Sequence, residues 1–327
     1  MINTDTIIEN KEYIIIAILL LLVELIYFEI ANRCNIIDKP NKRSSHTQIT
    51  IRGGGIIFPV GIIVAFVLGY VSLWVTIAVV AVGTISFMDD IRPLSTLPRF
   101  FTHIMAALLI FYELDLFVLE FWFIPVILVF LIGWINAFNF MDGINGITVL
   151  YVFITLITFA YLPINKSETP LLITMIVSCL VFGFFNVRIK AKTFAGDVGS
   201  ISIAILLGYF MIKTIVKTEQ IGYLLFFAVY GIDAAITIGH RLIKKENILE
   251  AHRSHLYQYL ANECKYSHVL VAFIYATFQL LINGFVIYID EHGYLSILNS
   301  LLLLSLLIFV YLFIRTFLIR NIILKND

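Results

Sequence analysis

Long apolar runs separated by short polar segments dominate this chain of 327 residues. A helix needs about 20 apolar residues to cross a bilayer, and eleven runs approach or reach that length. They lie at 12–30, 56–72, 74–88, 99–112, 121–138, 144–162, 171–186, 199–216, 222–240, 268–288 and 295–318. The runs at 74–88 and 99–112 are short. The pattern therefore predicts an all-α polytopic membrane bundle with ten or eleven transmembrane helices.

The composition supports a membrane protein and argues against other classes. Hydrophobic residues make up 61% of the chain and charged residues 13%, with a mean hydropathy of +0.98, whereas soluble domains carry about 25% charged residues. Lysines plus arginines number 22, as do aspartates plus glutamates, and this zero net charge argues against a nucleic-acid partner. The three cysteines have no framework spacing, so no disulfide is expected.

The basic residues predict the orientation of the bundle. If the N-terminus lies outside, the inside segments are 31–55, 89–99, 139–143, 187–198, 240–267 and the tail after 314. All but four of the 22 lysines and arginines then lie inside, the exceptions being Lys11, Lys166, Lys213 and Lys217. The positive-inside rule therefore predicts an outside N-terminus, a cytoplasmic C-terminus and long polar loops on the cytoplasmic face.

The first cytoplasmic loop is basic and ends in three consecutive glycines. Arg52 is the last of its basic residues and stands directly before the glycines at 53–55. Glycines lack side chains, so their backbone N–H groups can approach an anion closely. A basic topology signal followed by a flexible hinge is the alternative interpretation.

Asp89 and Asp90 form an acidic pair at the cytoplasmic end of the third run. A helix C-terminus is itself partly negative, so two adjacent carboxylates there need a positive partner. Mg²⁺ is the usual partner of such oxygen ligands, often shared with substrate phosphates. A solvated acidic helix end is the alternative.

Two further segments place polar residues at the ends of runs. Asn136, Asn139 and Asp142 recur every third residue, which puts them on one side of a helix that faces protein or a wet cleft. Helix–helix hydrogen bonding is the alternative for the asparagines. Asp197 lies at the start of the eighth expected helix, just before the run at 199–216 and after the basic segment 188–192. A metal–phosphate complex could bind there, although helix capping alone also explains a carboxylate.

The loop 240–267 carries two histidines that flank an arginine. His252 and His255 are three residues apart and share a helix face, and Arg253 lies between them. Histidine and arginine donate well to phosphate oxygens. A zinc site that adds Cys264 and His268 is disfavoured, because this spacing fits no common zinc pattern.

In this order, the motifs resemble the polyprenyl-phosphate N-acetylhexosamine-1-phosphate transferases, glycosyltransferase family 4, which include the MraY, WecA and TagO types. The form of the last motif is most similar to the WbpL-type branch. The resemblance covers most of the chain and rests on RSSH…RGGG at 43–55, Asp89 with Asp90, NxxNxxDG at 136–143, Asn186, AGDVGS at 195–200, Asp233 and AHRSHLYQ at 251–258.

The resemblance implies one integral-membrane transferase domain whose catalytic loops are the cytoplasmic segments named above. Such an enzyme transfers an N-acetylhexosamine 1-phosphate from a UDP-sugar to undecaprenyl phosphate, at the cytoplasmic face of the inner (plasma) membrane. It releases UMP and begins a cell-surface polysaccharide such as lipopolysaccharide or capsule. Mg²⁺, or else Mn²⁺, is the implied cofactor, and a homodimer is compatible with it.

The resemblance and the charge pattern together assign roles to individual residues. Catalysis is expected from Asp89, Asp90, Asp197 and His255, with Asp197 as the main metal ligand and Asp89 and Asp90 in support. Substrate binding is expected from Arg52, Asn136, Asn139, Asp142, Asn186, His252 and Arg253.

Departures from the family pattern and rival functions complete the analysis. Asn145 replaces the second acid of the usual DGxDG, a basic stretch at 188–192 replaces a segment that contains proline, and Thr50-Ile51-Arg52 departs from the usual PTPRGG. A secondary transporter and a non-catalytic scaffold are the rival functions. Transporters bind near the bilayer midplane, whereas here the acids cluster at helix ends and only Asp233 is expected within a span.

Overall fold

The computed structural model describes residues 4–40, 45, 48–247 and 253–326, and its architecture is all-α as predicted. Each of the eleven apolar runs has its own long helix in the described chain. The helices are α1 (Thr4–Arg33), α2 (Ile57–Val67), α3 (Leu73–Ile91), α4 (Thr96–Glu113), α5 (Phe123–Met141), α6 (Ile147–Tyr161), α7 (Thr169–Asn186), α8 (Gly196–Thr218), α9 (Ala228–Ile243), α11 (His268–Glu291) and α12 (Ile297–Asn326).

Eight helical segments among the described residues are long and apolar enough to cross a membrane. Two of them include a preceding 3₁₀ segment, Pro163–Glu168 before α7 and Ile221–Phe227 before α9. Helices α2 and α6 are apolar but shorter. The polytopic bundle is therefore confirmed, while the number of crossings and their orientation stay predictions.

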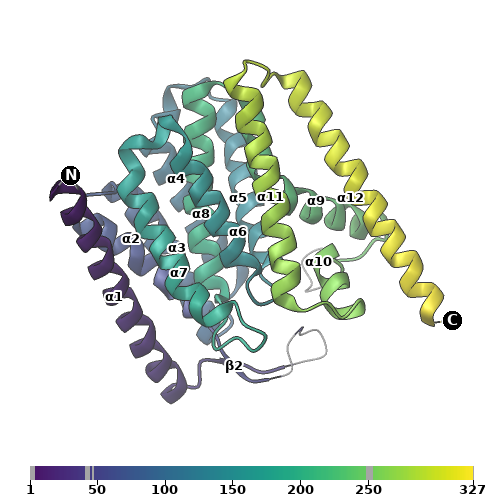
Figure 1. Ribbon diagram of the computed structural model, residues 1–327, viewed down its shortest axis with the longest axis horizontal. Helices are drawn as coiled ribbons and strands as arrows, with labels where there is room; N and C mark the ends of the chain where they lie inside the picture. The colour runs from purple at the N-terminus through teal and green to yellow at the C-terminus, as the bar shows by residue number, and fades with distance from the viewer. Residues whose placement is uncertain (1–3, 41–44, 46–47, 248–252, 327) are drawn as a thin grey trace.

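Helix α8 is the central element of the bundle (Figure 1), and 94% of its most apolar 18-residue stretch is buried. It packs against α3 on one side and α5 on another. Stacked aromatic rings fill the neighbouring core, since Trp134 lies 3.7 Å from Phe227 and Tyr151 lies 3.7 Å from Tyr230 between ring centroids. By contrast, α12 lies at the edge of the bundle, and only 6% of its most apolar 18-residue stretch is buried.

Helices α3 and α11 begin with a capping side chain, but α8 does not. The hydroxyl groups of Ser72 and Ser267 accept backbone N–H groups at the starts of α3 and α11, as capping residues do. The residue before α8 is Ala195, whose side chain cannot cap. The first N–H groups of α8 must therefore find acceptors elsewhere in the chain.

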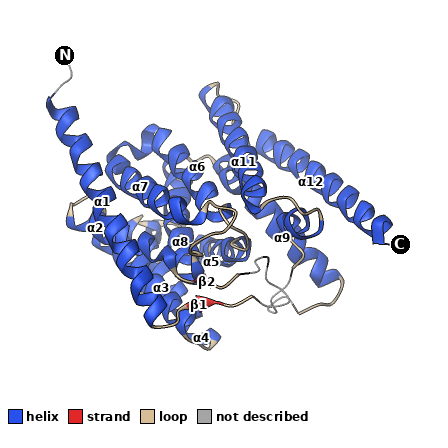
Figure 2. Cartoon of the chain, turned by 60° about the horizontal axis from the view of Figure 1, so that its bottom comes forward, coloured by secondary structure: helices blue, strands red, loops and turns tan. Residues whose placement is uncertain are grey.

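The described parts of the segments predicted to be cytoplasmic gather at one end of the bundle (Figure 2). Strands β1 (Ile37–Asp38) and β2 (Thr50–Ile51) form a two-stranded antiparallel sheet, and Ile51 also bridges to Thr193. The Tyr257 hydroxyl donates to the Phe140 carbonyl oxygen at 3.0 Å, which joins the loop after α9 to the end of α5. The short α10 (Leu256–Gln258) and the π turn Tyr259–Glu263 belong to this same end.

Candidate active site

The three glycines pack directly against the start of α8. The N–H groups of Gly54 and Gly55 donate to the carbonyl oxygens of Phe194 and Ala195, at 2.9 and 3.0 Å. A Cβ atom at Gly55 would lie 2.3 Å from the Cα of Gly199. The expectation that these N–H groups bind an anion is therefore wrong for Gly54 and Gly55, and so is the flexible hinge. The glycines allow two backbone segments to touch.

Asp90 supplies the cap that α8 lacks. Its carboxylate accepts the N–H groups of Asp197 and Val198, both at 3.0 Å, and the Nε of Arg52 at 2.7 Å. The side chain is fully buried. Asp90 was expected to help bind metal, but protein donors take both of its oxygen atoms. Its part in this structure is to hold Arg52 and the N-terminus of α8 in place.

Arg99 bridges the carboxylates of Asp89 and Asp197. The sequence analysis did not identify this arginine as a site residue. Its guanidinium lies 2.9 Å from Asp89 and 3.2 Å from Asp197, each distance measured from nitrogen to carboxylate oxygen. Asp89 is held further by the Leu94 N–H at 2.6 Å. A basic residue at the start of α4, just after the acidic pair, was the available signal. The positive partner that Asp89 requires is thus this arginine.

Asp197 lies between two arginines. Besides Arg99, the guanidinium of Arg52 lies 3.6 Å from its other carboxylate oxygen. The cluster formed by Arg52, Asp89, Asp90, Arg99 and Asp197, called here the carboxylate–arginine cluster, has one negative charge in excess. That charge is suited to a cation, and the two guanidiniums are suited to phosphate oxygens.

The polar stripe at the end of α5 reaches the cluster only in part. The Ser200 hydroxyl, one turn into α8, donates to the Asn139 side-chain oxygen at 2.6 Å. The structure does not bring Asn136 to the cluster, because this exposed side chain donates to the Ile132 carbonyl oxygen of its own helix at 2.8 Å. The prediction that Asn136 shares the site is thus unsupported by any contact.

Asp142 follows α5 and accepts the Thr148 hydroxyl at 2.5 Å. Its pKa is raised to about 7, mainly because burial desolvates the carboxyl group and to a smaller extent because the negative charges of Asp197 and Asp90 lie nearby. Asp142 therefore belongs electrostatically to the carboxylate–arginine cluster.

Asn186 joins two loops near the cluster. Its side-chain oxygen accepts the Gly146 N–H at 2.8 Å, and its side-chain nitrogen donates to the Thr193 carbonyl oxygen at 2.8 Å. Both of its polar atoms are thus used to fix backbone. Asn186 thus shapes the site by fixing backbone, and its contact with a nucleotide stays a prediction.

A polar pocket of about 270 Å³ lies beside the segment that leads into α8. Asn145 lies at its wall, where its side-chain nitrogen donates to the carbonyl oxygens of Arg188 and Ile189. Its buried side-chain oxygen has no partner among the described residues. Two departures from the family pattern, Asn145 and the basic stretch at 188–192, are thus in contact. A carboxylate at position 145 could not donate to these carbonyl oxygens. The pocket lining also includes Gln48, Lys190, Phe194 and His268.

His255 lies in a buried hydrogen-bond network. Its Nδ1 is 3.1 Å from Asp233, whose carboxylate also accepts the hydroxyls of Tyr275 and Tyr311 at 2.6 and 2.9 Å. Asp233 thus anchors the loop after α9. Arg253 is half-buried and its Nε has no partner in the described chain. His252 lies outside the described residues.

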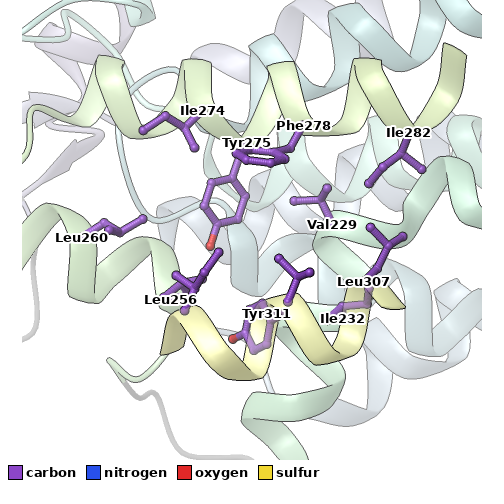
Figure 3. A pocket seen from close by; sticks show the side chains of 12 residues that line it. Val229, Ile232, Leu256, Leu260, Ile274, Tyr275, Phe278, Ile282, Leu307 and Tyr311 are labelled. Carbon is purple, nitrogen blue, oxygen red and sulfur yellow. The ribbon is translucent and has the colours of Figure 1, made fainter. Parts of the chain in front are cut away.

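An apolar pocket of about 140 Å³ lies between α9, α11 and α12, with Tyr275 and Tyr311 in its wall (Figure 3). The other labelled side chains are hydrocarbon, for example Phe278 and Leu307. The tyrosine hydroxyls are used by Asp233, so nothing in this lining can hold a phosphate. The pocket is no candidate for the binding of a charged substrate.

The carboxylate–arginine cluster fits a magnesium ion by the chemistry of its donors. A single guanidinium bridges Asp89 and Asp197, so the two carboxylates share one positive partner and are oxygen ligands of the kind that Mg²⁺ takes. No group of three or more His, Cys, Asp or Glu side chains suited to a metal is found within the described residues. Mg²⁺ commonly takes only one or two carboxylates and completes its shell with water and substrate phosphates.

Comparisons with known proteins find similar transferases. A family model described as glycosyl transferase family 4 matches residues 70–215, which include Asp89, Arg99 and Asp197. The chain is 25% identical over 274 residues to a probable undecaprenyl-phosphate N-acetylglucosaminyl 1-phosphate transferase of Bacillus subtilis, covering 76% of each chain. It is 37% identical over 109 residues to a phospho-N-acetylmuramoyl-pentapeptide-transferase of Lactococcus lactis, covering 33% of this chain and 32% of the relative.

Proposed function

Because the chain belongs to glycosyl transferase family 4 and is thus a phospho-sugar transferase, we propose its substrates and its reaction. It transfers an N-acetylhexosamine 1-phosphate from a UDP-sugar to undecaprenyl phosphate at the cytoplasmic face of the inner membrane. UMP is released, and the lipid-linked sugar begins a cell-surface polysaccharide. The name of the Bacillus subtilis relative supports the acceptor and the sugar class.

The observation that carries this proposal is the placement of two arginines and three carboxylates around the N-terminus of α8. Arg52 and Arg99 both reach Asp197. Donor and acceptor are both anionic, so their approach requires cationic groups at the bundle end where they meet. A transporter would place such groups nearer the midplane of the membrane.

The reaction exchanges one diphosphate bond for another. An oxygen of the acceptor phosphate attacks the sugar-bearing phosphorus of the donor, and the bond from that phosphorus to the bridging oxygen breaks. The bridging oxygen leaves with UMP. The second pKa of a phosphate monoester is about 6, so most of the acceptor has already lost its proton at neutral pH and no strong base is needed.

The residues of the cluster divide the work. Arg52 and Arg99 bind phosphate oxygens, and Asp90 fixes Arg52 through the bond at 2.7 Å. Asp89 and Asp197 would hold Mg²⁺, which when bound neutralises phosphate charge. Asn139 accepts the hydroxyl of Ser200 at the start of α8, and Asp142 adds negative charge to the cluster. His255 and Arg253 approach the sugar diphosphate from the loop that Asp233 anchors.

The polar pocket beside α8 suits the base of the donor nucleotide. The Phe194 ring offers an apolar face, and the amide side chains of Gln48 and Asn145 in the lining can contact the polar edge of a uracil ring. Lys190 and His268 contribute positive or donor groups at the same pocket. The pocket adjoins the cluster along the chain, because Phe194 precedes Asp197 by three residues.

The test is to mix the purified protein with Mg²⁺, a short-chain polyprenyl phosphate and a panel of UDP-sugars, and to measure UMP. We expect UMP release with one or more UDP-N-acetylhexosamines, loss of release in EDTA, and recovery with Mg²⁺ or Mn²⁺ but not Zn²⁺. Absence of UMP with every sugar would refute the proposed reaction. Full turnover in EDTA would refute only the role of the metal and would leave the proposed reaction standing.

A further inference from the structure

Arg99 occupies the position between the two carboxylates that a divalent cation would share. One guanidinium nitrogen lies 2.9 Å from Asp89 and another lies 3.2 Å from Asp197. Arginine stays protonated in proteins, so its charge cannot be removed to make room for a second cation. A metal ion can bind both carboxylates only if Arg99 moves away.

We propose that Arg99 is an internal counter-cation, which competes with the divalent metal for Asp89 and Asp197 until a diphosphate draws it away. The inference rests on the proposed function, because it takes a nucleoside diphosphate as the incoming anion. Under this proposal the binding of metal and of diphosphate is coupled. The metal binds weakly alone and more tightly when the diphosphate is present.

The surroundings allow Arg99 to move and hold Arg52 still. The partners of Arg99 are partly accessible, since the side chains of Asp89 and Asp197 are 11% and 17% exposed. The side chains of Arg99 and Arg52 are 28% and 36% exposed, so the partners of the two arginines, and not their exposure, distinguish them. Arg52 instead binds the fully buried Asp90, and its carbonyl oxygen accepts the Tyr27 hydroxyl at 2.5 Å. Arg52 is therefore anchored at both its backbone and its side chain.

Charge balance favours the exchange. With Arg99 in place, the two guanidiniums nearly neutralise the three carboxylates of the cluster. A dication added beside Arg99 would meet a like charge within a few ångströms, which is unfavourable in a partly buried site. A diphosphate offers the guanidinium a matching pair of acceptor oxygens, so the arginine can leave its carboxylates without losing ion pairs.

The experiment measures Mn²⁺ binding by electron paramagnetic resonance on the purified full chain, without acceptor and with or without UDP as the diphosphate probe. For wild type we expect weak binding that UDP strengthens about tenfold, within the usual range of coupling between two ligands. For Arg99→Gln we expect Mn²⁺ alone to bind at least about tenfold more tightly than in wild type. UDP should add little to that variant.

Two further variants serve as controls. Arg33→Gln removes one positive charge from the exposed end of α1, where Arg33 pairs only with Glu29 in the described structure, and should leave Mn²⁺ affinity unchanged. Arg99→Lys keeps the charge without the fork that reaches two carboxylates, and should bind Mn²⁺ with intermediate affinity. It also covers the case in which Arg99→Gln fails to fold, which thermal unfolding in detergent would reveal.

Equal or weaker Mn²⁺ binding by Arg99→Gln, or by Arg99→Lys if the first does not fold, overturns the inference. So does UDP that fails to strengthen Mn²⁺ binding to wild type. Either result leaves the proposed reaction standing if wild type still releases UMP from a UDP-sugar. Failure of that UMP assay is a separate outcome that concerns the reaction and not Arg99.

Discussion

The carboxylate of Asp90 accepts the backbone N–H of Val198 at 3.0 Å across 108 positions of sequence. The bond places the end of α3 against the start of α8, and it substitutes for the capping side chain that Ala195 cannot supply. Through the same carboxylate, Arg52 is brought beside Asp197. One buried side chain therefore determines the geometry of the cluster.

Replacement of that side chain is expected to weaken the fold as well as the site. In Asp90→Asn, the NH₂ group would face either the Val198 N–H alone or both the Asp197 N–H and the Arg52 guanidinium, so at least one buried donor loses its acceptor. We expect a loss of about 2 kcal/mol in the free energy of unfolding, seen as a lower thermal midpoint in detergent. Asp115→Asn is the control, because Asp115 is exposed with φ 53°, a conformation that asparagine tolerates. Equal midpoints for the two variants would contradict the capping role.

The close contact between Gly55 and Gly199 is expected to be intolerant of any side chain. A Cβ at either glycine would lie within 2.6 Å of the other's Cα atom, and backbone cannot shift as a flexible side chain can. Gly55→Ala should therefore prevent folding or strongly lower the thermal midpoint. Gly284→Ala in α11 has nothing within 4 Å of its new Cβ, and should be neutral or stabilising by up to about 1 kcal/mol. A normal midpoint for Gly55→Ala would show that the segment packs differently.

Asp142 is expected to make stability depend on pH. Its pKa rises from 3.8 to about 7 on folding, so the folded state favours the protonated form. The stability it contributes is complete below the unfolded pKa and is lost as pH rises towards about 7. The thermal midpoint of wild type should therefore fall relative to that of Asp142→Asn between pH 5 and pH 8. A constant difference between the two midpoints over that range would contradict the shifted pKa.

How far the sequence predicts this molecule depends on the distance over which each contact acts. Hydropathy is a local property, and it placed one helix on each of the eleven runs. The partners of the acids are not local: Asp197 meets Arg99 across 98 positions, so no spacing rule could pair them. For Asn136 the spacing predicted a shared helix side, but it could not tell which neighbour that side would face.

The glycines illustrate the same limit. Their lack of side chains was evident from the sequence, but the reason for it lies in the segment 194–199, far along the chain. The sequence could indicate that something approaches the glycines closely. Only the fold shows that the approaching group is protein backbone.

The orientation of the bundle can be tested by labelling single cysteines. In a background without Cys34, Cys179 and Cys264, the charge pattern predicts that Lys166→Cys is external and Lys245→Cys cytoplasmic. Both positions are exposed in the structure. An impermeant maleimide added to intact cells should modify position 166 and leave 245 unmodified. Modification of position 245 in sealed cells would contradict the predicted topology. It would also contradict access of the donor to the site from the cytoplasm.

The most direct test of the central claim is UMP release by Asp197→Asn, measured with the UDP-sugar that wild type uses. Asp197 lies between both arginines and would hold the metal, and the loss of such a ligand is worth several kcal/mol of transition-state stabilisation. We expect turnover to fall at least about 1,000-fold at every pH from 6 to 9, while Asp115→Asn keeps wild-type activity. An Asp197→Asn protein that is folded and releases UMP within about tenfold of the wild-type rate would contradict the claim that the carboxylate–arginine cluster is the active site.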